Sequence, residues 1–275
     1  MNMKKFFRTY FPFASNQIKA CMAYKGSVYL FILCSLFGSL INYYLWKAVY
    51  GSAGGGVIGG LTVSEMVIYV FMTYVTRMVA NVSINEEVSF DVVKGTVANN
   101  LIKPIDYRMS IIFKGFGYSM YNFVMPAVFV WIGVEIYRAK VLCLPFTGWV
   151  NLLLYVLSMM LSLLIYLLFD FCFGLIAFFT TYIFGLQMIE SAVLSFLTGQ
   201  LIPLTFFPDT VQKVFNFLPF SSMTYAPVMI YLGKFQGSEL AFVLLRQVIW
   251  VVLLYVIGSL IWKRVTKRLI VLGYG

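Results

Sequence analysis

Polar positions in this chain are confined to short stretches that separate long apolar runs. Six runs are long enough to cross the hydrocarbon core of a bilayer, which takes about 20 helical residues at about 1.5 Å each. They cover residues 27–49, 61–80, 109–134, 150–179, 187–206 and 240–262. We therefore expect an all-α polytopic membrane protein whose residues 1–275 form a single transmembrane domain.

Composition supports the same fold class. Hydrophobic residues make up 61% of the chain and charged residues 11%, against roughly 45–50% and 25% in ordinary soluble domains. The net charge is +10, but a nucleic-acid-binding face needs basic residues clustered on a soluble scaffold. This chain has no such scaffold, so we expect no nucleic-acid partner. Because the sequence has no histidine, the commonest general base and metal ligand is missing. We expect no catalytic, cofactor or metal site on this chain.

Basic residues in the connections predict the orientation. An even number of crossings places both termini on one side, together with the connections 81–108 and 180–186. That side is rich in Lys and Arg, and the opposite side holds only Arg138, Lys140, Lys213 and Lys234 outside the apolar runs. The positive-inside rule then places both termini in the cytoplasm.

Residues 1–26 combine aromatic side chains with Lys and Arg. This mixture is typical of an amphipathic helix that lies at the membrane surface, and we expect Pro12 to break it in two. A disordered basic tail is the alternative.

Residues 81–108 form the only sizeable polar stretch on the predicted cytoplasmic side between crossings. Ser83 with Glu86 three residues later has the pattern of a capping box. Lys94 followed by Gly95 fits the end of a helix. These signals predict a short helix outside the membrane.

That helix covers residues 84–94, and Ile84, Val88 and Val92 give it one apolar face. We expect headgroups or another protein to cover this face. Two roles are open: a solvated linker, or a coupling helix that docks into an ATPase and transmits its motion.

Prolines interrupt residues 198–233, which hold Pro203, Pro208, Pro219 and Pro227. Proline removes a backbone donor, and freed backbone groups at membrane depth must be buried in protein or line a cavity. We predict a broken helix and a re-entrant or interfacial hairpin on the outer side, over about 207–239. An ordinary extracellular loop is the alternative.

The charged residues singled out inside the apolar runs are Arg77, Asp170, Glu190 and Arg246. Charges in a membrane are costly and require a partner or water. Our hypothesis is that Arg77 pairs with Glu190 or Asp170. Snorkelling of Arg77 and Glu190 to the interface is the alternative, and Arg246 either snorkels outward or faces the transport path.

The glycine-rich residues 51–60 lack the GK[ST] ending of a phosphate-binding loop, so we expect a flexible external turn. No Walker motif occurs anywhere in the chain. Any ATP hydrolysis must therefore come from a partner.

Taken in order, these segments resemble ABC-2-type transporter permeases. Acidic residues, then Gly95-Thr96, then Leu101 and Pro104 resemble the cytoplasmic loop between their second and third helices. Gly199 and the prolines that follow it resemble their external hairpin. Val-Ala-Asn-Asn stands where an acidic residue often follows the Gly-Thr pair. The resemblance implies that ATPase coupling involves Ser83, Glu86, Glu87, Asp91, Lys94, Gly95, Thr96, Leu101 and Pro104, and that an outer gate involves Gly199, Pro203, Pro208, Pro219 and Pro227.

The resemblance also implies an exporter fold, in which an amphipathic elbow helix leads into six transmembrane helices. Two such permeases, identical or unlike, would pair around a path in a bacterial plasma membrane. Two ABC ATPase subunits would carry ATP and Mg. A secondary transporter or channel that uses Asp170, Glu190 and Arg77 as an ion relay is the alternative, and a membrane enzyme or scaffold is a third.

Overall fold

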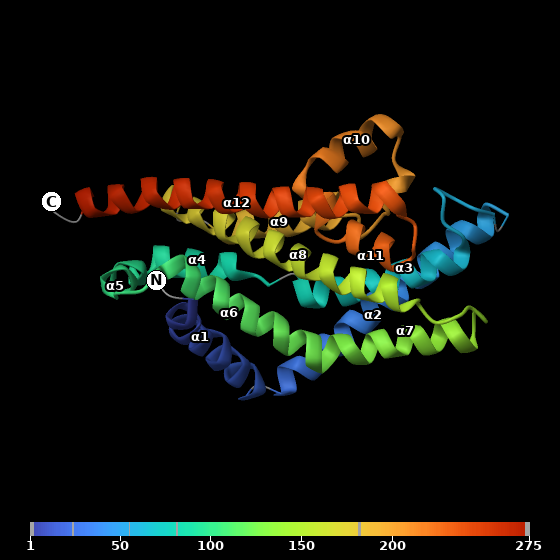
Figure 1. Ribbon diagram of the computed structural model, residues 1–275, viewed down its shortest axis with the longest axis horizontal. Coiled ribbons are helices and arrows are strands. Elements are labelled where there is room, and N and C mark those ends of the chain that lie inside the picture. Colours follow the sequence, from blue (N-terminus) through green and yellow to red (C-terminus); the bar gives the residue numbers. More distant parts are fainter. Residues whose placement is uncertain (1–2, 24, 55, 81, 181–182, 273–275) are drawn as a thin grey trace.

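Long helices run side by side along the molecule in the computed structural model, which describes residues 3–23, 25–54, 56–80, 82–180 and 183–272 (Figure 1). The α-helices are α1 Met3–Ala23, α2 Lys25–Ser52, α3 Val63–Ala80, α4 Ile84–Val93, α5 Thr96–Ile102, α6 Tyr107–Asn122, α7 Val128–Lys140, α8 Trp149–Gly174, α9 Ile183–Leu197, α10 Asp209–Phe217, α11 Tyr225–Tyr231 and α12 Gly237–Leu272. A π-helical turn, η1 Phe123–Ala127, joins α6 to α7, and 3₁₀ turns occur at η2 Leu175–Phe178, η3 Leu204–Phe206 and η4 Pro219–Ser222. The described part of the chain contains no strand beyond one isolated bridge, so the predicted all-α class is confirmed.

Four stretches of the described chain are long and apolar enough to cross a membrane: Val63–Val93, Tyr107–Lys140, Trp149–Phe178 and Gly237–Lys267. They contain or overlap the second, third, fourth and sixth predicted spans. Helix α2 has 28 residues, about 42 Å, which is long enough for the first span, but several of its side chains lie outside the described residues.

The fifth predicted span, 187–206, is wrong as a continuous helix. Helix α9 has 15 residues and ends at Leu197, so it is about 22 Å long, short of a hydrocarbon core of about 30 Å. Gly199 follows with a φ of 78°, in the left-handed region that ends helices. The chain then turns back instead of continuing.

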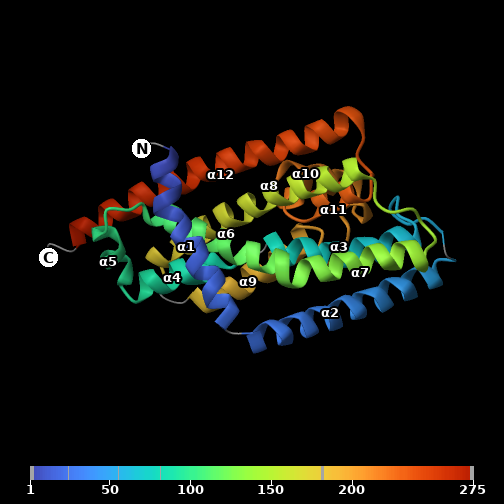
Figure 2. The same ribbon diagram turned by 60° about the horizontal axis from the view of Figure 1, so that its bottom comes forward.

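Helix α1 is also different from the prediction, because it continues through Pro12. Pro12 lies on the exposed side of the helix, where water or headgroups can solvate the carbonyl that loses its donor. Figure 2 shows α1 lying oblique to the long helices, across the bundle. It packs on α6, with the Tyr10 and Phe113 rings stacked 5.7 Å apart.

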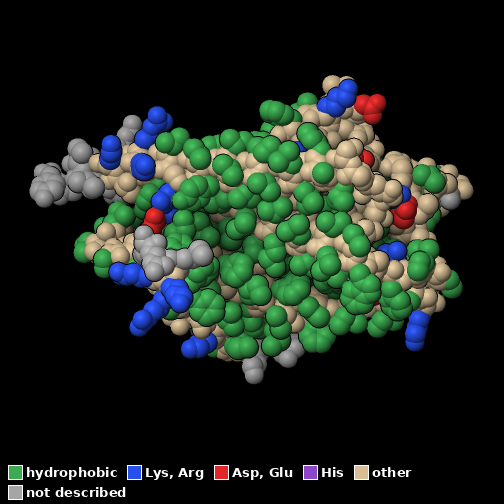
Figure 3. Space-filling view, viewed as in Figure 1, with side chains coloured by type: hydrophobic (Ala, Val, Ile, Leu, Met, Phe, Trp, Pro, Cys, Tyr) green, Lys and Arg blue, Asp and Glu red, His purple; other side chains and the backbone are tan. Residues whose placement is uncertain are grey.

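The two ends of the molecule differ in composition. One end holds α1, α4, α5 and the last turns of α12, and most Lys and Arg side chains in view gather there (Figure 3). We call this the basic end. The other end, the loop end, holds α10 and the connections 53–62, 141–148 and 232–236. Between them the surface is largely hydrophobic (Figure 3), and large apolar side chains of α7, α8 and α12 are exposed. An apolar belt between polar ends is the surface that a bilayer covers.

We expect Gly117→Ala to weaken the packing of α1 on α6. A Cβ at Gly117 would clash with the Ala14 backbone, whereas a Cβ at Gly133, in α7, would meet nothing within 4 Å. Overpacking of this kind costs about 1–3 kcal/mol. Thermal unfolding in detergent should therefore occur at a lower temperature for Gly117→Ala and at an unchanged or higher temperature for Gly133→Ala. Equal melting temperatures for the two variants would contradict the close contact.

Candidate functional site

The two ends of helix α4 differ in how well the sequence predicted their capping. Ser83 precedes it but makes no capping bond, and the Asn85 Oδ1 atom accepts the Glu86 amide instead, at 2.7 Å. The predicted capping box of Ser83 and Glu86 is therefore wrong. At the other end Lys94 is the C-cap and Gly95 has a φ of 71°. The predicted end at Lys94 and Gly95 is confirmed, because glycine adopts this conformation without a steric penalty.

The predicted apolar face of α4 is covered by the chain itself. Ile84 and Val88 are buried, and α4 packs against α8 and η2. Gly174, the last residue of α8, permits this approach, because a Cβ there would lie 2.9 Å from the Val88 Cβ. The expectation that headgroups or a second protein cover this face is thus wrong. The role of Ile84 and Val88 is to hold α4 in place.

A different set of apolar side chains remains exposed on the α4–α5 segment. We call it the open surface: Phe90, Val93, Leu101 and Ile102, of which Phe90 is 59% and Ile102 is 82% exposed. Lys94 and Pro104 are exposed beside it. The open surface lies at the basic end of the molecule (Figure 1).

Asp91 links α4 to the two helices that follow it. Its Oδ1 atom accepts from the Thr96 hydroxyl at 2.6 Å. Its Oδ2 atom accepts from Asn100 Nδ2 at 3.2 Å and from the Tyr107 hydroxyl at 2.8 Å. Glu87 adds an ion pair with Lys114 of α6. These contacts connect α4, α5 and α6 into one unit.

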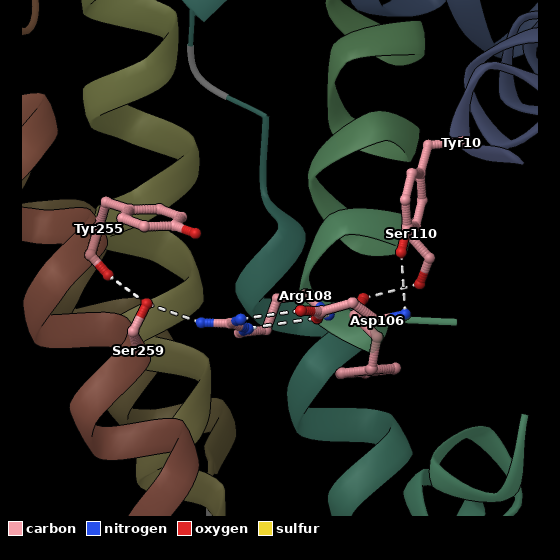
Figure 4. A network of polar contacts seen from close by, with 7 residues as sticks. Tyr10, Asp106, Arg108, Ser110, Tyr255 and Ser259 are labelled. Atoms are coloured by element: carbon pink, nitrogen blue, oxygen red, sulfur yellow. Dashed lines mark hydrogen bonds and ion pairs between the residues drawn. The ribbon is translucent and has the colours of Figure 1, made fainter. Parts of the chain in front are cut away.

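The beginning of α6 is tied in turn to α1 and α12 (Figure 4). Arg108 donates to both oxygens of Asp106, at 3.2 and 2.8 Å, and to Ser259 of α12 at 2.6 Å. The Asp106 amide donates to the Tyr10 hydroxyl of α1 at 3.0 Å. Burial raises the pKa of Asp106, but the hydrogen bonds and charge of Arg108 outweigh it, so the pKa lies below its ordinary value.

At the loop end the chain folds back into the bundle after α9. The Gly199 carbonyl accepts the Tyr69 hydroxyl, and every residue of α11 is buried, packed on α3 and α8. The prolines occupy four different settings: Pro203 is buried before η3, Pro208 precedes α10 at the surface, Pro219 begins η4, and Pro227 lies inside α11. An ordinary external loop does not describe this segment.

The charged residues of the apolar runs do not pair as hypothesised. Within the described chain, ion pairs join Arg108 to Asp106, Lys114 to Glu87 and Lys234 to Glu65, and none includes Arg77. The hypothesised pair of Arg77 with Glu190 or Asp170 is therefore wrong. Arg246 donates instead to the Asn216 carbonyl of α10 at 3.0 Å.

Asp170 and Glu190 line one cavity together with Arg77. The cavity measures about 610 Å³ and lies among α3, α4, α8 and α9. Asn85 donates to Glu190 Oε2, which joins α4 to α9. A second cavity of about 620 Å³, bordered by α2, α3, α4 and α6, also reaches Arg77. Access to two cavities explains how Arg77 stays solvated without an ion pair.

Sequence reasoning missed several residues that position this site. Tyr107, Asn85 and Lys114 connect elements that are far apart in sequence, and no local pattern marks such partners. Gly174 carried a signal, because small residues in apolar membrane helices let another backbone approach closely.

Together the apolar belt (Figure 3), the ordered segment at the basic end and the two cavities define a polytopic membrane protein with charged residues around internal cavities. The family model described as "ABC-2 family transporter protein" matches residues 36–273, and the chain belongs to this family. The resemblance noted from the sequence is thus confirmed. As an ABC-2 permease, the chain belongs to the membrane component of a transporter, not to its ATPase, and the family associates in general with an ABC ATPase. A comparison with curated proteins finds no match.

We expect Asp91→Ala to release α5 from α4. The three hydrogen bonds that the Asp91 carboxylate accepts are lost. Thr96 then keeps only its bond to the Asp91 carbonyl, and the total cost is about 1–3 kcal/mol. Hydrogen exchange of amides 96–102 should then accelerate. The exposed Glu86, changed to Ala, is the control and should leave these amides unchanged; slow exchange in Asp91→Ala would refute the linking role.

The Asp106–Arg108 contact should give stability that depends on pH. Because the folded pKa of Asp106 is lowered, its contribution is present above the unfolded value of about 3.9 and is lost as pH falls through the folded pKa. Unfolding of the parent chain and of Asp106→Asn should therefore differ at neutral pH and converge in acid. A difference that stays constant across this range would contradict the assignment.

Proposed function

We propose that this chain is the permease subunit of an ABC-2 exporter and forms half of a translocation path driven by a separate ATPase. The observation that carries the proposal is the arrangement of the α4–α5 segment. One side of it packs on α8 and is bonded to α6, and the other side exposes the open surface to solvent. Membership of the ABC-2 family supports the same conclusion. A solvated linker would need neither the buried contacts of α4 nor exposed Phe90 and Ile102.

The contacts of α4 provide routes by which a push on this segment reaches the membrane. The packing of Val88 against Gly174 transmits the displacement to α8. Asp91 with Tyr107 passes it to α6, and Arg108 with Ser259 continues to α12. Short, rigidly attached helices transmit displacement because packed interfaces shift as units and do not deform continuously.

Orientation follows from charge. The basic end, with α1, α4, α5 and the last turns of α12, faces the cytoplasm under the positive-inside rule, so the ATPase docks there. The loop end, with α10, η4 and α11, faces outward in a bacterial plasma membrane. Pro203, Pro208, Pro219 and Pro227, with Gly199, shape the outer gate.

The complex contains two permeases, identical or unlike, and two ATPase subunits. ATP and Mg bind to the ATPases, and this chain carries no cofactor. Closure of the ATPases around ATP moves the two α4–α5 segments, and the path changes from inward-open to outward-open. Substrate leaves past the segments that follow Gly199.

We expect Phe90→Asp and Ile102→Asp to abolish capture of the ATPase. A buried, unpaired carboxylate at an apolar interface is strongly destabilising, whereas the free permease exposes both positions to solvent and should fold normally. The tagged chain is purified from its native cells, and co-purifying ATP hydrolysis is measured. Loss of about tenfold or more is expected for a hot-spot position.

Phe217→Asp is the matched control, because Phe217 is an exposed phenylalanine of the short helix α10 at the opposite end. It should retain the ATPase. If Phe90→Asp and Ile102→Asp retain the ATPase and Phe217→Asp loses it, docking occurs at the loop end and the proposal is contradicted. Transport driven by an ion gradient with no ATPase bound would favour the secondary-transporter alternative.

A further inference from the structure

The cavity among α3, α4, α8 and α9 contains more negative than positive charge. Three carboxylates line it, those of Glu86, Asp170 and Glu190, whereas Arg77 is the sole basic residue among its lining residues. Asp170 is only 3% exposed and Glu190 only 7%. Carboxylates buried this deeply are costly unless a cation or hydrogen-bond donors compensate them.

Compensation of Glu190 is incomplete. Its Oε2 atom accepts from Asn85, but Oε1 is buried without a hydrogen-bond partner, and no Lys or Arg of the described chain lies within ion-pair distance. A buried acceptor that lines a cavity and lacks a donor is the group that a bound ligand would satisfy.

The rest of the cavity is suited to an organic molecule. Its walls include the aromatic side chains of Phe90, Tyr166 and Phe184 and the apolar side chain of Met188. A volume of about 610 Å³ is within the usual range for ligand pockets, roughly 300–1,000 Å³. Phe184 is 69% exposed, so the apolar wall extends to the surface of α9. Aromatic faces and carboxylates together attract a cation with hydrophobic substituents.

We infer that this cavity binds a lipophilic monovalent organic cation, with Glu190 and Asp170 as its counter-charges and Arg77 limiting its affinity. As a statement about transport, the inference rests on the proposed function, because it names such cations as the class that the exporter moves. Binding of the cation itself does not require the ATPase. An inorganic multivalent ion is the weaker occupant, since the described residues contain no group of three or more His, Cys, Asp or Glu that could hold a metal.

The test uses two probes of the same shape and opposite charge, tetraphenylphosphonium and tetraphenylborate. Binding to the full chain in nanodiscs is measured at mildly alkaline pH without nucleotide, and partitioning into empty nanodiscs is subtracted. Glu190→Gln keeps an acceptor for Asn85 and removes the charge. It should weaken binding of the phosphonium by about tenfold or more, and Asp170→Asn should act in the same direction.

Arg77→Gln supplies the opposite change. It should strengthen phosphonium binding, and it should not strengthen binding of the borate. Asp209→Asn, an exposed carboxylate of α10, should alter neither. A merely structural role of these residues would change both probes in the same direction, and that result, or absence of phosphonium binding to the parent chain, would overturn the inference.

ATP-driven efflux of the phosphonium from vesicles with the bound ATPase separates the two proposals. Charge-dependent binding without ATP-driven efflux supports the cation site and counts against the exporter. ATP hydrolysis coupled to the permease without charge-dependent binding supports the exporter and overturns the cation site.

Discussion

The contact between Val88 of α4 and Gly174 of α8 is the constraint on which the rest of the arrangement depends. A glycine at the end of a long apolar helix lets the α4 backbone approach so closely that a single added carbon would meet Val88 at 2.9 Å. This approach buries the apolar side of α4 and sets which residues remain exposed. It also brings Asn85 to Glu190 and Asp91 to Tyr107. The orientation of the whole polar segment therefore follows from the fit of two helices.

Charge placement follows a second physical rule, that an ion in an apolar environment needs a partner or water. Arg108 has Asp106 as its partner at the basic end, and Arg246 has a backbone carbonyl of α10. Arg77 has neither and lies instead between two cavities. Asp170 and Glu190 are more deeply buried, and the Glu190 Oε1 atom has no hydrogen-bond partner. The interior thus carries charged groups around its two cavities, whereas the surface between the two ends is largely apolar (Figure 3).

The sequence predicted those features that arise from local patterns. Apolar runs predicted the long helices, and Lys94-Gly95 predicted the end of α4, because both depend on residues that are neighbours in the chain. The beginning of α4 at Ile84 was predicted correctly, but its predicted capping box was wrong, since the Asn85 side chain accepts the Glu86 amide instead. Pro12 was wrongly expected to break α1, since the carbonyl that loses its donor is on the exposed side of the helix. The break expected within 198–233 occurs at its very start, because α9 ends at Leu197, so the predicted span 187–206 was too long. The exposed face of α4 depends on its packing against Gly174 at the end of α8, far along the chain, and no local pattern reveals it.

The most direct test of the central claim, that the α4–α5 segment docks an ABC ATPase, is photo-crosslinking in intact native cells. A photoreactive phenylalanine analogue replaces Phe90 in one strain and Phe217 in another, and the adducts are identified by mass spectrometry. Docking predicts that the Phe90 position forms an adduct with a protein that contains Walker motifs and that the Phe217 position does not. An ATPase adduct from the Phe217 position alone, or none from Phe90 in a strain that retains transport, would contradict the account.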